Sequence, residues 1–158
     1  MIIIRKVPKV SRYVRNEKGI SASKTMAKTI LYTTNFSNSS KHALQWAITL
    51  ARQLKAHITI LYTYRLIKSN NSEAIQLKKK IEADALRNFA DLEHDLLSNQ
   101  NISYDFRMEV GFMNDRVHQL TQNVPINFLV MDREMSTENK ESFDELVEQI
   151  KVPLVIVP

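Results

Sequence analysis

The stretch Lys28–Ala56 constrains the fold more than any other part of the chain. It begins with a β-prone run, Thr29–Thr33, passes through a polar turn that ends in Ser37-Asn38-Ser39, and continues with apolar residues spaced three and four apart. Serine and asparagine side chains can accept hydrogen bonds from the free N–H groups at the start of a helix. Apolar residues at this spacing form one face of a helix. A strand that leads directly into a helix is the first half of a βαβ unit, which is typical of α/β folds.

The same alternation of strand and helix continues to the end of the chain. Further strands are expected at His57–Tyr64, Ile102–Val110, Ile126–Met131 and Leu154–Val157. Helices are expected between them at Glu73–Asn99, Asn114–Asn123 and Ser136–Ile150. Five strands separated by four helices predict a three-layer α/β/α fold, with a parallel sheet and right-handed crossovers. Ile102–Val110 alternates between apolar and polar residues, so we expect it to be an outer strand of the sheet.

Length and composition exclude several classes of protein. The chain has 158 residues, of which 44% are hydrophobic and 25% charged, as expected of one globular domain. It contains no apolar run of about 18 residues, so no membrane span is expected. It contains no cysteine, which excludes disulfides, thiolate metal ligands and a cysteine nucleophile. A cysteine-free chain fits the reducing cytoplasm, where we expect this protein to act.

The basic character of the chain is concentrated at its N-terminus. Residues 1–28 hold eight Lys or Arg and one acidic residue, whereas the remainder holds 14 basic and 16 acidic residues. We therefore divide the chain into a basic N-terminal extension, residues 1–25, and one domain, residues 26–158. The extension is expected to be mobile or loosely docked. The alternative is a functional basic arm that contacts nucleic acid, because the remainder is too nearly neutral to offer such a surface.

Several segments, taken in order, resemble a known family. The run Ile30-Leu31-Tyr32-Thr33-Thr34-Asn35-Phe36-Ser37, with the amphipathic helix after it, resembles the opening of universal stress proteins. Segments similar to later parts of that family are Ile58–Tyr62, Gly111, Phe128–Met131 and Val152–Val157. The resemblance covers residues 28–158. It implies a five-stranded parallel sheet of order 3-2-1-4-5, as in adenine nucleotide alpha hydrolase-like folds, a role in the stress response and, usually, a dimer.

The chain departs from the family where nucleotide-binding members hold ATP. Those members carry an Asp at the end of the first strand, where this chain has Asn35, and a glycine-rich stretch after the fourth strand. Here Met131 is followed by ten residues without glycine, which include Asp132, Glu134, Glu138 and Glu141. A phosphate cradle needs close backbone N–H groups and a chain free to adopt positive φ, and acidic side chains repel phosphate.

These departures indicate a degenerate nucleotide-binding motif. We therefore expect no cofactor, no ATP and no enzymatic activity, and instead a stress-response protein that acts through an unidentified protein partner or by regulation. An ATP-binding or slowly ATP-hydrolysing member of the family is the alternative.

A crevice for a small ligand is expected where the order of parallel strands reverses, beyond the carboxyl ends of the two central strands. Its candidate residues follow the first and fourth strands of the predicted sheet: Thr33, Thr34, Asn35, Met131, Asp132 and Arg133. The plainer interpretation is that these residues cap helices and form loops at the end of the sheet.

No catalytic residue and no metal site can be assigned from the sequence. The four histidines, at positions 42, 57, 94 and 118, lack the spacing of metal ligands, so solvated or capping roles are expected for them. No phosphate-binding loop, dinucleotide-binding fingerprint or nucleophile elbow is present. Trp46 lies off the main apolar stripe of the first helix, and we expect it to be partly buried, although an exposed tryptophan there would indicate an interface.

The last strand is the expected dimer interface. The resemblance places that surface at Leu154, Val155, Ile156 and Val157. An apolar strand at the edge of a sheet pairs readily with another strand, and a symmetric dimer would pair it with its own copy.

Overall fold

A computed structural model of the chain describes residues 2–6, 27–67, 70–137 and 140–158. One sheet of six strands forms its centre, in the order β1-β4-β3-β2-β5-β6. The strands are β1 (Ile2–Lys6), β2 (Thr29–Thr33), β3 (His57–Tyr64), β4 (Tyr104–Val110), β5 (Phe128–Asp132) and β6 (Leu154–Val157). The five strands from β2 to β6 are parallel to one another. Numbered by themselves along the chain, they have the predicted order 3-2-1-4-5.

The sixth strand, β1, was not predicted. It pairs with β4 antiparallel, from Ile2 opposite Met108 to Lys6 opposite Tyr104. The prediction that the strand at Ile102–Val110 is outermost is therefore wrong, because β4 lies between β1 and β3. Most of the basic extension, residues 7–25, lies outside the described residues, as does the basic arm proposed there.

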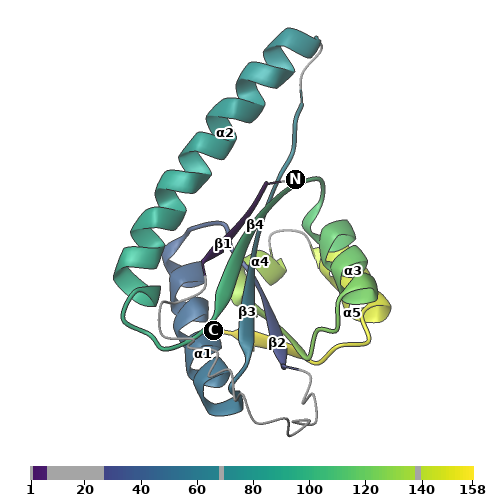
Figure 1. Cartoon of the computed structure of the whole chain (residues 1–158). Coiled ribbons are helices and arrows are strands. Elements are labelled where there is room, and N and C mark those ends of the chain that lie inside the picture. The colour runs from purple at the N-terminus through teal and green to yellow at the C-terminus, as the bar shows by residue number, and fades with distance from the viewer. Residues whose placement is uncertain (1, 7–26, 68–69, 138–139) are drawn as a thin grey trace, which may run out of the picture.

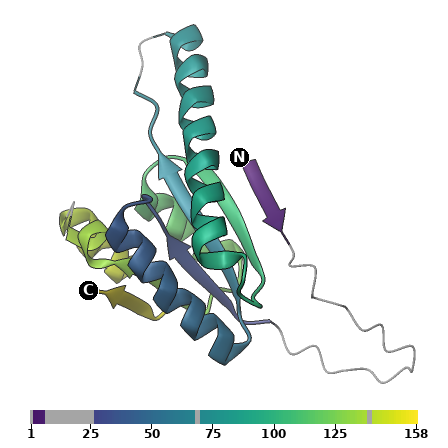
Figure 2. The ribbon, with the colours of Figure 1, turned by 90° about the vertical axis from the view of Figure 1, so that its left-hand side faces the viewer.

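Helices cover both faces of the sheet (Figure 1). They are α1 (Asn38–Leu54), α2 (Asn71–Leu92), which continues into the π-helical turn η1 (Glu93–Leu97), α3 (Met113–Asn123), α4 (Arg133–Thr137) and α5 (Lys140–Gln149). α1 and α2 lie on one face, and α3 and α5 lie on the other (Figures 1 and 2). The N-terminal part of α2 extends past the sheet in both views.

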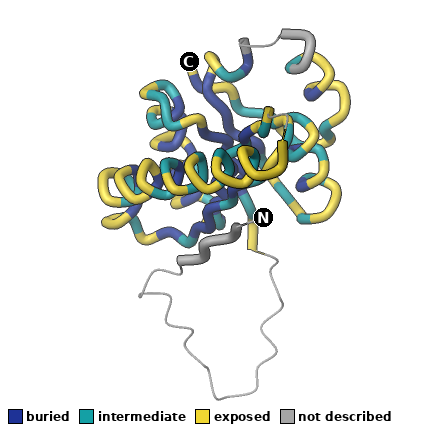
Figure 3. The backbone as a smooth tube through the Cα atoms, turned by 90° about the horizontal axis from the view of Figure 1, so that it is seen from above, coloured by how far each residue is buried: buried dark blue, intermediate teal, exposed yellow. Residues whose placement is uncertain are grey.

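The core consists of two apolar layers, one on each face of the sheet. Ile30, Ile58 and Phe106 belong to the larger layer, together with the buried side of α1. Leu31 and Leu129 belong to the smaller layer, which lies under α3 and α5. Neighbouring residues of a strand point to opposite faces, so continuous apolar runs such as Ile30-Leu31 are buried on both sides. Figure 3 shows this pattern, with buried residues concentrated in the strands and exposed residues along α2.

Two sequence predictions about helices need correction. The single helix expected at Ser136–Ile150 is divided in the structure, because α4 starts immediately after β5 and α5 starts at Lys140. Trp46, expected to be partly buried, is 57% exposed, because the apolar stripe of α1 that faces the sheet does not include it. In the parts of the chain that are described, no helix is both long and apolar enough to cross a membrane.

Candidate functional site

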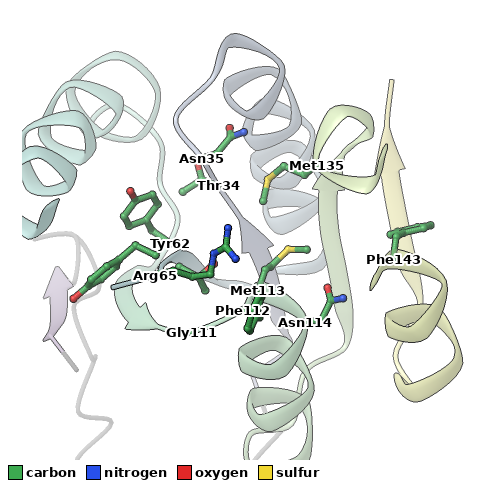
Figure 4. Close-up of a pocket in the computed structure, with 12 residues that line it drawn as sticks. Thr34, Asn35, Tyr62, Arg65, Gly111, Phe112, Met113, Asn114, Met135 and Phe143 are labelled. Atoms are coloured by element: carbon green, nitrogen blue, oxygen red, sulfur yellow. The ribbon is translucent and has the colours of Figure 1, made fainter. Parts of the chain in front are cut away.

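A cavity of about 390 Å³ lies at the carboxyl ends of the parallel strands (Figure 4). Thr34 and Asn35 reach it from the end of β2, and Met135 reaches it from α4. Its other lining residues come from the end of β3, the segment after β4 and α5: Tyr62, Thr63, Tyr64, Arg65, Gly111, Phe112, Met113, Asn114 and Phe143. The cavity thus occupies the point where the order of strands reverses, which is the usual ligand position in such sheets.

Two of the six residues predicted for the crevice, Thr34 and Asn35, line this cavity, and four do not. Thr33 and Met131 are buried, since their side chains point into the layers of the fold. Asp132 is 1% exposed and lies under the first turn of α4, whereas Arg133 on that helix is exposed to solvent away from the cavity.

The segment after β2 forms one wall of the cavity, and hydrogen bonds of hydroxyl groups hold this segment in place. The Tyr32 hydroxyl donates to the backbone oxygen of Ser40 at 2.5 Å, and the hydroxyls of Ser40 and Thr34 lie 2.8 Å apart. Thr34 Oγ1 also accepts a hydrogen bond from the backbone N–H of Phe36 at 3.0 Å. Burial raises the pKa of Tyr32 to about 12, so its hydroxyl stays protonated and can donate at physiological pH.

Phe36 holds the same loop against the sheet in an unusual conformation. Its φ is 63°, in the left-handed region that residues with a Cβ atom rarely adopt. Its ring centroid lies 5.1 Å from that of Tyr62 and 6.1 Å from that of Phe106. Contacts between aromatic rings at these distances are favourable and offset part of the backbone strain.

The turn after β5 is closed by the chain's own carboxylates. Asp132 Oδ1 accepts a hydrogen bond from the backbone N–H of Met135 at 2.8 Å, which caps α4. Ser39 Oγ, at the start of α1, donates to Glu134 Oε2 at 2.7 Å and so links α1 to α4. Oδ2 of Asp132 is buried and has no hydrogen-bond partner among the described residues. The turn after β5 therefore has one carboxylate that caps α4 and a second that bonds to the start of α1.

Another part of the cavity wall contains a cation–π contact between an arginine and a phenylalanine. Cζ of Arg65, just after β3, lies 5.1 Å from the ring centroid of Phe112. Gly111 brings Phe112 to this position with a φ of 138° and donates its N–H to the backbone oxygen of Tyr64 at 2.9 Å. Gly111 carries part of the family resemblance in the sequence, but Arg65 and Phe112 were not predicted. Nothing in the local sequence indicated that they would meet.

A second polar cluster lies at the other end of β3 and β4. His57 Nε2 is 2.8 Å from Asp105 Oδ1, and His57 Nδ1 is 2.9 Å from Ser103 Oγ. Thr59 and Arg107 also donate to the Asp105 carboxylate, at 2.7 and 2.8 Å. The expectation that His57 is a solvated or capping residue is wrong, because it bridges two strands.

The remaining histidines do not gather around a common point. His42 and His94 are exposed, and His118 lies 2.8 Å from Gln122 Nε2 on α3. Over the described ranges, no group of three or more His, Asp or Glu side chains is arranged to hold a metal ion.

Comparison with known proteins gives one family. A sequence model of the "Universal stress protein family" matches residues 26–158. No curated protein matches the chain. Among solved structures, the universal stress protein UspA from Lactobacillus plantarum is similar over 83% of this chain and 97% of its own, with 13% identity and a TM-score of 0.69.

Two other similar structures contain nucleotides. A universal stress protein in complex with cAMP matches 83% of this chain and 97% of its own, with 18% identity and a TM-score of 0.61. A family protein from Arabidopsis thaliana with AMP bound matches 82% of this chain and 90% of its own, with 17% identity and a TM-score of 0.57. At these identities the likeness shows the fold alone.

Proposed function

Because the chain belongs to the universal stress protein family over residues 26–158, we propose that it is a stress-response protein that acts through a protein partner and does not hydrolyse ATP. The fold and the family support the first part of this proposal. The second part rests on one observation, the Asp132 carboxylate that caps α4.

The cap is unfavourable for a polyphosphate in two ways. It uses the backbone N–H of Met135, which would otherwise be available to an anion at this turn. It also brings the carboxyl groups of Asp132 and Glu134 to this turn, and a phosphate about 4 Å from a charged carboxylate would be repelled by a few kcal/mol at an effective dielectric constant of about 20. The proposal therefore includes no ATP cofactor and no catalytic residue.

Thermal unfolding in the presence of ATP tests this part. A ligand at 100 times its Kd that binds only the folded state stabilises it by about 2.7 kcal/mol, which is easily seen as a higher Tm. We expect no shift at millimolar ATP with Mg²⁺ and no release of ADP. A clear shift together with bound nucleotide in native mass spectrometry would overturn the proposal.

Nucleotide binding is the second candidate function, and the cavity itself favours it. The space at the switch point is open in the structure, and relatives of the same fold have AMP or cAMP bound. Parallel unfolding measurements with AMP and cAMP separate the two candidates, because a response to these ligands without a response to ATP would show binding that does not need a triphosphate cradle.

The proposal also includes a homodimer that forms through β6. In the sheet of the described residues, β6 has one neighbour, β5, so its other edge is open to a second copy. Ile156 on this strand is 42% exposed, which is unusual for a large apolar residue in a strand. A cytoplasmic location belongs to the same proposal and is supported by the lack of cysteine in the sequence.

A further inference from the structure

Among the strands of the described sheet, only β1 lies outside residues 26–158, which the family model matches. It has one neighbour in the sheet, β4, and lies at the end of the sheet (Figures 1 and 2). The family part of the sheet therefore ends at β4, and β1 is an added strand on its edge. An edge of this kind can bind extended segments through main-chain hydrogen bonds.

β4 is held in place by contacts that do not involve β1. All seven residues of β4 pair with β3 on its other side. The ring of Phe106 stacks on that of Phe89 in α2, with centroids 4.2 Å apart. The Tyr104 hydroxyl donates to the carboxylate of Glu93, in the π-helical turn, at 2.6 Å. The edge is therefore preorganised for a neighbouring strand, which lowers the cost of ordering on binding.

β1 covers only part of this edge. It pairs with residues 104–108 and leaves Glu109 and Val110, at the end of β4, without a strand neighbour on this side among the described residues. Val110 is 42% exposed. A segment two residues longer than β1 would pair with the whole of β4.

The register indicates the chemistry of a segment that fits this edge. In β1, isoleucine lies opposite Met108 and Phe106, and arginine lies opposite Asp105. Residues directly opposite each other on neighbouring strands interact, and apolar pairs and pairs of opposite charge are favourable. By the same rule Glu109 favours a basic residue and Val110 an apolar one. The favoured segment is therefore apolar at alternate positions, with basic residues opposite Asp105 and Glu109.

We propose that the edge of β4 is a docking site for an extended segment of a partner protein with this apolar and basic pattern, and that β1 occupies the site in the same chain until the partner displaces it. A tethered segment competes at an effective concentration on the order of millimolar, so a partner displaces β1 only if it binds more tightly. The additional pairs with Glu109 and Val110 provide such a gain. The inference rests on the proposed function, because it gives the protein partner a surface. Failure of the peptide test below would reject this surface only, whereas the measurement with ATP tests the proposed function itself.

A fluorescently labelled peptide, Val-Lys-Ile-Ile-Ile-Arg-Lys, measures the site by anisotropy. Its first two residues fall opposite Val110 and Glu109, and the others repeat residues 2–6. The double variant Ile3→Pro/Ile4→Pro in the full chain should release β1. Successive residues of an antiparallel pair alternate between bonded and unbonded positions, so one of the two prolines removes a hydrogen bond to β4. We expect this variant to bind one peptide per chain, about tenfold more tightly than the unchanged chain, because β1 no longer competes.

Two further variants support the comparison. The matched control Ile3→Val/Ile4→Val keeps both N–H groups and should bind the peptide as weakly as the unchanged chain. Arg5→Glu weakens β1 without proline, because it places a like charge opposite Asp105, and should also bind the peptide more tightly than the unchanged chain.

A second peptide tests the charge pattern. It carries glutamate in place of the arginine and the first lysine, so that like charges fall opposite Asp105 and Glu109. Its affinity for the proline variant should be about tenfold lower than that of the first peptide. Hydrogen exchange locates the site, because the first peptide should slow exchange in residues 104–110 and leave β6, at the other edge of the sheet, unchanged.

Several results would overturn the proposal. One is the absence of saturable peptide binding to both the proline variant and Arg5→Glu. Equal affinity of the proline variant and the unchanged chain, or protection of β6 instead of β4, would place the peptide elsewhere. Equal affinity of the two peptides would reject the charge pattern. A larger mass of the proline variant in light scattering would show that a second copy occupies the edge, and loss of its folded circular dichroism spectrum would show that β1 is a required part of the fold.

Discussion

The Nε2 atom of His57 lies 2.8 Å from Oδ1 of Asp105, and this contact joins β3 to β4 at the end of the sheet opposite the cavity. Burial by itself would raise the pKa of Asp105, but hydrogen bonds from His57, Arg107 and Thr59 outweigh it and lower the pKa to about 2. The buried carboxylate is therefore charged at physiological pH and has several donors, which is the arrangement that a buried charge requires.

Asp105 should make stability depend on pH in the acid range. Its pKa is lower in the folded state than the ordinary value of 3.8, so its contribution is complete above about pH 4 and is lost as the pH falls towards 2. The shift corresponds to about 2 kcal/mol. We expect Asp105→Asn to lower the free energy of unfolding by about this amount at neutral pH, with the difference from the unchanged chain shrinking in acid. Urea unfolding of both proteins across this range measures it, and a difference independent of pH would contradict it.

Gly111 should tolerate no side chain. Its φ is 138°, and a Cβ atom added there would lie 2.9 Å from Nε of Arg116. Backbone strain of this kind costs about 1–3 kcal/mol, so Gly111→Ala should lower the free energy of unfolding by that amount. The same substitution in an Arg116→Ala background separates the two causes. We expect most of the loss to persist there, because removing the arginine relieves the contact but not the strain; full recovery would assign the loss to the contact.

The parallel core was predictable because it depends on local patterns. The bounds of β2, β3 and β6 agree with the prediction, since each is a short apolar run with polar or proline residues beside it. The strand β1 could not be predicted in this way. It begins in a segment that is read as a basic tail, and its partner Met108 is about a hundred positions away from Ile2.

The site was less predictable, because its side chains meet only through the register of the sheet. Arg65 and Phe112 come together because the ends of β3 and β4 are paired, with Tyr64 opposite Val110. His57 and Asp105 meet in the same way at the starts of those strands. Asp132 was identified as acidic and unfavourable for phosphate, but the sequence did not reveal that it ends β5 and also caps α4.

Asp132 should contribute to stability through its cap and not through its charge. Asp132→Ala removes the acceptor for the Met135 N–H, and the loss of such a cap costs about 1 kcal/mol. Asp132→Asn keeps an oxygen that can accept this bond and removes a buried charge whose Oδ2 has no partner in the described part of the chain. We therefore expect the asparagine variant to be at least as stable as the unchanged chain and clearly more stable than the alanine variant. Equal losses in urea unfolding at neutral pH would contradict this.

Trp46, the one tryptophan of the chain, should report an exposed position on α1. We expect its fluorescence emission to resemble that of tryptophan in water and to be quenched strongly by iodide. Unfolding in urea should then change its emission little. A blue-shifted emission protected from iodide would show that a partner or a second copy covers this face of α1 in solution.

Ile156 should control the oligomeric state if β6 is the dimer interface. Ile156→Glu places a charge on an exposed apolar position of this strand, where it would be buried in a dimer. The matched control is Ile75→Glu on α2, a position that is 56% exposed and far from β6 along the chain. We expect light scattering at concentrations well above micromolar to show a dimer for the unchanged chain and for Ile75→Glu, and a monomer with an unchanged circular dichroism spectrum for Ile156→Glu. A dimer that survives Ile156→Glu would place the interface on another surface, and a monomer in all three samples would exclude the dimer altogether.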